Sequence, residues 1–442
     1  MANELHLGMR RVGDLIDFNP DTPPVKVALE HSDRGVGVTL SWSTEDNPYA
    51  SWFLRDDGFV RIPPRPKAPP APKRVLFRDS HGSVLLVGCR ARGFHSNVGG
   101  PGSGTMWARA AIMGVQGEID FDNPHGLQTE IGGLRAWLRR TSWEETRRYE
   151  ERVQEVTVKS LNLPELKVGE YEGLRLSIAF GWGVQQEGDG DRRILTDIAR
   201  CSTRTDTPTS WSTHLKLHYA VRDLLILSRW QETLCKEVRA LRLDDPLRTL
   251  DGVEHGEQWR GVVIPAKEES IPPRGHRAHL VEYDDLGTNG LLRWIELRDE
   301  FARAIDPVVS SIGLRGATAN TLLAQTGPGL EALGYLLMVR DGTSKKAATA
   351  TTLKKRFERI LADLGDSLPF NGASWVDAAA AAYNGLKHAN RREPDPVDVV
   401  NAWRECVLVT RAWVAIELGV PVDRVRERLA MDPQRHAYVK VD

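Results

Sequence analysis

Residues 375–392 combine a histidine, an amide and several cations at helical spacing, in the sequence WVDAAAAAYNGLKHANRR. The alanine run at 378–382 predicts a helix, because alanine has the highest helix propensity of all residues. On that helix Asn384 and His388 lie four residues apart and share a face. Arg391 follows three residues later and joins this face on a continuous helix. Polar groups therefore gather near one helix end.

Three more side chains add to this group. Tyr383 and Lys387 form a second pair four residues apart, and Arg392 follows Arg391. We expect Tyr383 and Arg392 to contact the substrate. Histidine titrates near neutral pH and serves as general base or acid. A cation stabilises the charge that develops on a phosphate, and an amide orients phosphate or imidazole. These residue types suit RNA cleavage. They are also typical of a helix C-terminus, where histidine and cations meet the negative end of the helix dipole.

A second basic segment lies upstream, at residues 340–359. It holds seven Lys or Arg and two acidic residues, a net charge of +5. Lys354 and Lys355 are its candidates for contact with a polyanionic substrate, because clustered cations concentrate the field on one side of a nearly neutral protein. A solvated helix face explains the same charges without a partner.

His214 and His218 are also four residues apart, on a helix that we expect from Thr213 to Arg229 with Ser212 or Thr213 as its N-cap. The spacing is that of metal ligands, but no glutamate follows the first histidine and no third ligand is evident. We interpret them as half-buried structural histidines and predict no metal site.

The second half of the chain must position residues 383–392, and its apolar residues recur at helical period. Five helices are predicted, at residues 289–314, 317–339, 347–364, 375–389 and 397–418. Helices in this number with short connections form a bundle.

The first half is predicted to be β-rich, because short apolar runs alternate with turn residues. The strand candidates are residues 25–29, 36–42, 74–77, 83–87, 107–115 and 174–182. Such strands suggest a sandwich or barrel-like domain, so the predicted fold class is α+β. We place the β-rich domain at residues 1–245 and the helical bundle at 286–432. Between them, residues 246–285 form a proline-punctuated linker, with one possible strand near 261–265.

Composition excludes several classes of protein. The 442 residues carry a net charge of −1, which excludes a globally basic nucleic-acid coat and an acidic disordered tail. Four scattered cysteines argue against a disulfide framework and a structural zinc site. Neither an export signal nor an apolar run of about 20 residues is evident, so we expect a cytoplasmic protein without membrane contact.

The helical bundle with Asn384-Gly-Leu-Lys-His388 near its end resembles a HEPN domain. Its combination with a β-rich first half resembles the ApeA-type HEPN proteins of bacterial anti-phage defence. Three upstream segments resemble parts of that family: residues 133–137 (GLRAW), 218–227 (HYAVRDLLIL) and 330–333 (LEAL), the last similar to a glutamate-bearing helix early in the bundle.

The resemblance implies a site and an assembly. HEPN ribonucleases share an Arg-polar-x-x-x-His motif, work as dimers whose two motifs line one cleft, and cut RNA without metal or cofactor by attack of the neighbouring 2′-hydroxyl. Here the polar position is Asn384 and the histidine is His388, whereas Tyr383 occupies the arginine position. Lys387, Arg391 or Arg392 then supplies the missing cation, or the domain binds RNA without cutting it.

Three functions follow as hypotheses. The first is a metal-independent HEPN endoribonuclease that acts in abortive infection, regulated by its first half and by a phage-derived trigger. The second is a catalytically silent HEPN protein that binds RNA, dimerises or senses. The third is a β-rich ligand-binding module with a helical oligomerisation domain. The implied partners are RNA, with tRNA as one class, and a second copy of the chain.

Overall fold

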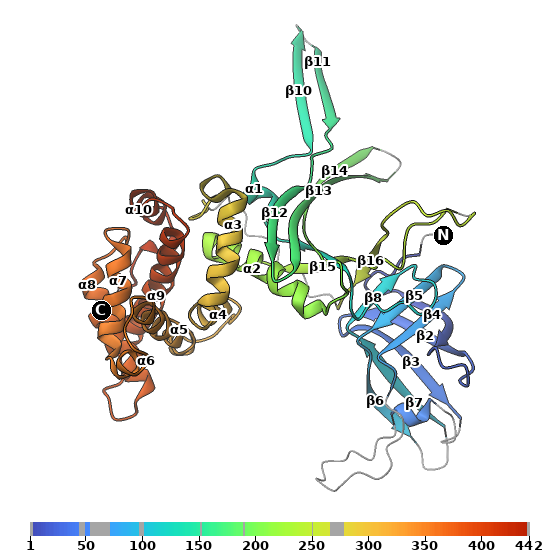
Figure 1. The fold of residues 1–442 in the computed structure, drawn as a ribbon, viewed down its shortest axis with the longest axis horizontal. Helices are drawn as coiled ribbons and strands as arrows, with labels where there is room; N and C mark the ends of the chain where they lie inside the picture. Colours follow the sequence, from blue (N-terminus) through green and yellow to red (C-terminus); the bar gives the residue numbers. More distant parts are fainter. Residues whose placement is uncertain are drawn as a thin grey trace.

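A β-rich region and a helical region follow one another along the chain, so the predicted α+β class is confirmed (Figure 1). The computed structural model describes residues 3–43, 49–53, 71–96, 101–150, 153–188, 191–249, 251–265 and 278–439. Strands occupy the chain from residue 10 to 263, and helices follow from residue 283.

Fourteen strands within the described ranges form one antiparallel sheet. The first eight are β1 Arg10–Ile16, β2 Val25–Ser32, β3 Gly35–Trp42, β4 Arg74–Asp79, β5 Gly82–Val87, β6 Arg90–Ser96, β7 Gly102–Ala108 and β8 Ala110–Met113. The others are β9 Gly126–Ile131, β12 Leu166–Tyr171, β13 Leu174–Glu187, β14 Arg192–Arg204, β15 Cys235–Leu241 and β16 Trp259–Val263. Their order is β12-β13-β14-β9-β15-β16-β8-β5-β4-β1-β2-β3-β7-β6.

Strand β16 joins the two parts of this sheet. It pairs with β15 on one side and with β8 on the other, where Val262 lies opposite Ile112. The strand predicted near 261–265 is therefore present, at 259–263, and it is integrated into the sheet. The predicted strand at 107–115 is wrong as a single element, because the chain turns at Arg109 between β7 and β8.

Two further strands, β10 Trp143–Glu150 and β11 Val153–Ser160, form a separate ribbon that projects from the sheet (Figure 1). Trp143 at its base contacts Trp182 of β13 edge to face, with ring centroids 5.4 Å apart. The short helix α1 Leu134–Leu138 precedes the ribbon and buries Trp137.

Helix α2 spans Trp211–Arg229, so it begins earlier than predicted. Its N-cap is Ser210, whose hydroxyl accepts a hydrogen bond from the backbone N–H of Thr213 at 3.3 Å. The indole N–H of Trp211 donates to the carbonyl of Phe121 at 2.7 Å. Burial of this tryptophan extends the helix upstream of the predicted caps, Ser212 and Thr213.

The paired histidines of α2 are structural, and they are fully buried rather than half-buried. Thr129 contacts Nδ1 of His218 at 2.6 Å, and Thr203 contacts Nε2 of His218 at 2.7 Å and Nδ1 of His214 at 2.8 Å. Nε2 of His214 lies 3.2 Å from the carbonyl of Pro124. A carbonyl only accepts, so one direction satisfies every group: Thr129 donates to His218, His218 to Thr203, Thr203 to His214, and His214 to Pro124. Both imidazoles are then neutral.

The helical region contains eight helices in the described ranges, compared with the five predicted. They are α3 Tyr283–Glu300, α4 Ala302–Ser311, α5 Ala319–Arg340, α6 Lys345–Ala350, α7 Leu353–Leu364, α8 Gly372–Lys387, α9 Pro396–Glu417 and α10 Val422–Ala430. The predicted helix at 289–314 breaks at Phe301, which is fully buried against Trp413. The helix predicted at 347–364 divides at Thr352, whose hydroxyl caps α7.

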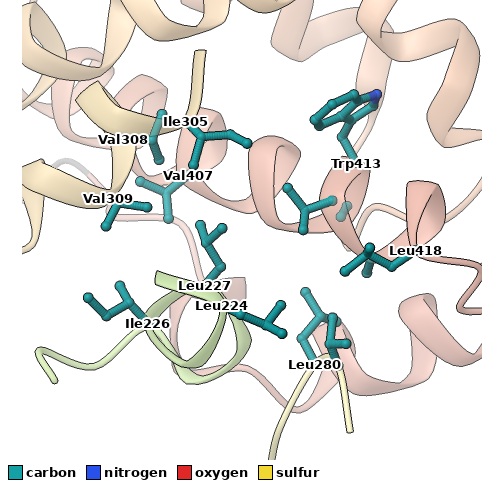
Figure 2. Packing of buried hydrophobic residues seen from close by; sticks show 14 of the residues in the cluster. Leu224, Ile226, Leu227, Leu280, Ile305, Val308, Val309, Val407, Trp413 and Leu418 are labelled. Carbon is teal, nitrogen blue, oxygen red and sulfur yellow. The ribbon is translucent and has the colours of Figure 1, made fainter. Parts of the chain in front are cut away.

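One hydrophobic core spans the junction of sheet and bundle. Leu224, Ile226 and Leu227 of α2 pack against α4 and α9, as Figure 2 shows around Val308 and Val407. The buried guanidinium of Arg411 in α9 reinforces this contact, because its Nε donates to the carbonyl of Leu227, at the end of α2, at 2.7 Å. The β-rich region is thereby fixed to the helical bundle that contains α8.

No helix within the described residues combines the length and the apolarity needed to cross a membrane.

Candidate functional site

Helix α8 carries the predicted site, and its sequence determines where it begins and ends. Asn371 is the N-cap and accepts from the backbone N–H of Ser374 at 2.9 Å. The helix ends at Lys387, and His388 is extended, with φ −122° and ψ 110°. The prediction that the helix reaches residue 389 and continues in phase to Arg391 is therefore wrong. Pro394 follows within a few residues and disfavours helix in the residue before it.

Tyr383, at the position of the family's arginine, points into the bundle. It is only 6% exposed, and its ring fills the space beside Gly327 of α5, where a Cβ atom would come within 2.5 Å of the ring. Burial, and then the negative charge of Glu331, raises the pKa of Tyr383 to about 12. Tyr383 is thus a neutral core residue, and the predicted contact of its side chain with substrate is at odds with this burial.

Glu331 of α5 joins the end of α8 to α7. One carboxylate oxygen accepts from Arg356 at 2.7 Å, and the other accepts from Lys387 at 3.1 Å. Arg356 is buried and also donates to the carbonyls of Ala348 and Thr349, which end α6. A buried guanidinium therefore fixes the carboxylate that holds Lys387.

Lys387 is held from a second side by an aromatic ring. Its Nζ lies 5.5 Å from the centroid of Tyr383, within the range of a cation–π contact. The side chain is 44% exposed, so its ammonium group remains accessible to solvent. Adjacent in sequence to His388, it is a cation with a defined position at this helix end.

The segment after α8 turns back along the helix. The N–H of Arg391 donates to the carbonyl of His388 at 2.9 Å, which forms a turn. At Gly385 a Cβ atom would come within 2.9 Å of the carbonyl oxygen of Arg392 and of Cδ of Pro394. Gly385 thus admits the returning chain, and this close approach keeps Arg391 and Arg392 near the helix end although neither belongs to the helix.

Asn384 and His388 both lie at this helix end, where the backbone N–H of His388 donates to the carbonyl of Asn384 at 3.1 Å. Asn384 is half-buried, whereas His388, Arg391 and Arg392 are exposed. Within the part of the chain that the structure describes, none of these four side chains has a hydrogen bond or ion pair. An imidazole, an amide and two guanidinium groups therefore have no partner among the described residues, and they lie near the ammonium group of Lys387, which Glu331 holds. Groups of these kinds can perform acid–base chemistry on a phosphodiester.

The basic segment at 340–359 is neutralised in part, by carboxylates of α5 and α9 and by Asp341 and Asp363 close to it in the sequence. The pairs are Arg340 with Glu417, Arg359 with Asp341 and Asp363, and Arg356 with Glu331. The predicted patch therefore carries far less free charge than its sequence suggests.

Lys354 and Lys355 are exposed but lie apart from the end of α8. Lys354 pairs with Asp377 at 2.5 Å. Asp377 precedes His388 by eleven residues in the sequence, which is about 16 Å along a helix. Lys354 and His388 therefore do not form one compact site. Among the described residues, Lys355 has no carboxylate partner.

Sequence reasoning missed the positioning residues Glu331, Arg356, Gly327 and Gly385. Glu331 lay within the LEAL segment that resembles the family, and the spacing of Gly327, Glu331 and Gly334 placed them on one face of α5. Gly334 packs against Arg356, where a Cβ atom would come within 2.6 Å of the arginine side chain. The small residues mark where α7 and α8 approach α5.

Family models match both regions of the chain. The ApeA N-terminal domain 1 matches residues 20–294, and the Apea-like HEPN domain matches residues 338–424, a range that includes α8 and the turn after it. Comparisons with curated proteins and with solved structures give no significant match. The first model alone spans more than half of the chain, and the second coincides with the candidate site. This chain therefore belongs to the ApeA family of HEPN-domain proteins.

Proposed function

We propose that this protein is a metal-independent HEPN endoribonuclease that acts in anti-phage abortive infection. The observation that carries the proposal is the exposed end of α8, where Asn384 and His388 lie beside three cations within the matched HEPN range. HEPN domains generally bind RNA and dimerise, which agrees with a cationic, solvent-facing site.

In the proposed reaction a phosphodiester bond is cut by the adjacent ribose. His388 of one protomer removes the proton of the 2′-hydroxyl, whose oxygen attacks phosphorus. The bond from phosphorus to the 5′-oxygen breaks, and His388 of the partner subunit gives that oxygen a proton. The products are a 2′,3′-cyclic phosphate and a 5′-hydroxyl. Asn384 orients the phosphate through its amide.

We assign the missing motif cation to Lys387 first. Arg391 would share the face of His388 only on a continuous helix, and α8 ends at Lys387. Lys387 is fixed by Glu331 and by the ring of Tyr383, so little entropy is lost when it meets a phosphate. Arg391 and Arg392 are the second choice, because they are exposed on the returning turn and bind phosphate bidentately.

We further propose a homodimer through the exposed face of α8. Ala379, Ala380 and Ala382 are already buried in the chain's own core, so most of the alanine run is not free for a partner. Ala378 and Ala381 remain exposed and lead along the helix to His388. A second copy packed on these small side chains would bring two His388 residues to one cleft.

A catalytically silent RNA-binding or dimerising HEPN protein is the second candidate. The burial of Tyr383 favours it, because a neutral ring occupies the place of the family's arginine. In either case we propose a cytoplasmic protein that recognises RNA, with tRNA as one class, and responds to a phage-derived trigger. We propose that residues 1–245 form most of the regulatory domain and 286–432 the HEPN bundle. The segment at 246–285, predicted as their linker, contributes β16 to the sheet.

Expression in bacteria tests the proposal. Wild type should halt growth and fragment cellular RNA, whereas His388→Ala should do neither. His436→Ala, which changes another exposed histidine, is the matched control and should behave as wild type. If wild type is inert and Tyr383→Arg gains activity, the silent function replaces the enzymatic one. Equal activity of wild type and His388→Ala would refute the site.

A further inference from the structure

An open cavity of about 320 Å³ lies on the surface of the β-rich region. The strands that form it are at the opposite end of the molecule from α8 (Figure 1). Strands β2, β3 and β7 and the turn between β2 and β3 form it. Its lining includes Glu30, Asp33, Arg34, Thr39, Thr105 and Trp107. This volume is in the range of small-ligand sites.

Trp107 provides an aromatic surface on the sheet. The residue opposite it on β3 is Gly37, where a Cβ atom would come within 2.9 Å of the indole ring. The glycine thus allows the ring to lie over the backbone of β3, and the ring is half-buried while it lines the cavity. Within the described ranges, its indole N–H donates no hydrogen bond. Such a ring can stack on a planar ligand and also donate to it.

Polar groups surround this ring on the next row of the sheet. Thr39 and Thr105 lie opposite each other, with their hydroxyl oxygens 3.5 Å apart. Glu30 and Asp33 are exposed at the other side of the cavity, and neither has an ion pair to any residue the structure describes. Hydroxyls and free carboxylates are acceptors that suit the amino groups of a base or the hydroxyls of a ribose.

Three arginines without carboxylate partners in the described chain complete the surface. Arg34 lies in the turn that lines the cavity. On the edge strand β6, Arg90 lies opposite Trp107 and Arg92 opposite Thr105, so both side chains share the outward face. Elsewhere in the same sheet Arg11 is paired with Asp79 at 2.5 Å. Free guanidinium groups gathered beside an aromatic ring favour a phosphate-bearing ligand over a neutral sugar.

We propose that this cavity binds a nucleoside phosphate, with its base stacked on Trp107 and its phosphate held by Arg90 and Arg92. A stacking ring flanked by cations on a sheet face is a recurring solution for nucleotides in single strands. The ligand is either a free nucleotide or a nucleotide of single-stranded RNA, and both present the same chemistry. The proposal does not depend on RNA cleavage at α8.

Measurements of nucleotide and RNA binding to the full chain test the proposed nucleoside phosphate site. The probes are fluorescently labelled ATP and a labelled single-stranded hexauridine RNA, measured by anisotropy in the His388→Ala background so that RNA stays intact. We expect Trp107→Ala to weaken binding by about fivefold to 150-fold, because stacking on one base contributes about 1–3 kcal/mol. Trp107→Phe should retain most of the affinity.

The charge of the site is tested separately. Arg90→Gln with Arg92→Gln should weaken binding and reduce its salt dependence, since fewer phosphate contacts release fewer ions. Both residues are exposed on an edge strand, so the variant tests the site even if Trp107→Ala fails to fold. Arg148→Gln, an exposed arginine of the β10–β11 ribbon, is the matched control.

The outcomes separate the sources of the ligand. Binding of labelled ATP assigns the site to a free nucleotide, and binding of the hexauridine alone assigns it to single-stranded RNA. The proposal is overturned if neither probe binds, or if the Trp107 and arginine variants bind as tightly as the Arg148→Gln control. Either result leaves the proposed function of α8 unaffected.

Discussion

Removal of the Glu331 carboxylate distinguishes Arg356, which we expect to stabilise the fold, from Lys387, which we propose as the catalytic cation. Glu331 bridges Arg356, whose side chain is 10% exposed, and Lys387, whose side chain is 44% exposed. Loss of the partner of a buried charge costs about 3–5 kcal/mol. Arg356 keeps two carbonyl acceptors, so we expect Glu331→Ala to lower the free energy of unfolding by about 3 kcal/mol.

The same structure predicts a small effect at the other end of the bridge. The pair with Lys387 is exposed to solvent, so Lys387→Met should cost less than about 1 kcal/mol. The loss of stability in Glu331→Gln should lie between those of Glu331→Ala and Lys387→Met, because its amide oxygen still accepts a hydrogen bond from Arg356 but carries no charge. Urea denaturation of each single and double variant gives the coupling free energies.

Activity then distinguishes the two cations. If Lys387 is the catalytic cation, Lys387→Met should abolish RNA cleavage while the protein remains folded. Two results would refute this reasoning: a Glu331→Ala variant within about 0.5 kcal/mol of wild type, or a stronger coupling of Glu331 to Lys387 than to Arg356.

Three further predictions follow from the fold. Burial lowers the pKa of His214 to about 4 and that of His218 to about 3. In the unfolded chain both pKa values are about 6.5, so the free energy of unfolding falls as the pH drops through about 6.5. At pH 5 the two histidines together lower it by about 4 kcal/mol, compared with its value well above pH 6.5. Urea denaturation should show that His214→Gln/His218→Gln loses this dependence, and an unchanged pH profile would contradict it. Gly327→Ala should lower the free energy of unfolding by about 1–3 kcal/mol in thermal unfolding, because the added methyl group meets the Tyr383 ring. Adding Tyr383→Val to this variant should restore part of the loss. A lack of rescue would show that the strain lies elsewhere. Ala381→Glu should convert the proposed dimer to monomers in light scattering, whereas Ala347→Glu, on exposed α6, should not; a dimeric Ala381→Glu would exclude this face.

Elements with a strong local signal were predictable from the sequence. The alanine run specifies α8, and the strands predicted at 74–77 and 83–87 are present as β4 and β5, because each depends on neighbouring residues. The α+β class and the family resemblance were confirmed for the same reason: periodicity and motif are local properties.

Features that depend on distant residues were not predictable. The end of α8 at Lys387 reflects the return of the chain over Gly385, which spacing alone does not reveal. The net charge of residues 340–359 was read without Glu417 and Asp377, which neutralise part of it from other helices. The break at Phe301 likewise results from its packing against Trp413.

The contribution of Tyr383 shows the limit most clearly. From the sequence it was a substitution in a motif, with a hydroxyl near the substrate. In the fold it is a core residue beside Gly327 whose ring lies under Lys387. The proposal that Lys387 supplies the cation rests on this packing of α5 against α8, which the motif alone does not reveal.

The central claim is tested most directly with purified full-length protein and RNA in the presence of EDTA. We predict that wild type and His436→Ala cut the RNA and leave 2′,3′-cyclic phosphate ends, whereas His388→Ala, folded to the same thermal stability, leaves it intact. Cleavage by His388→Ala at the rate of wild type would contradict the account.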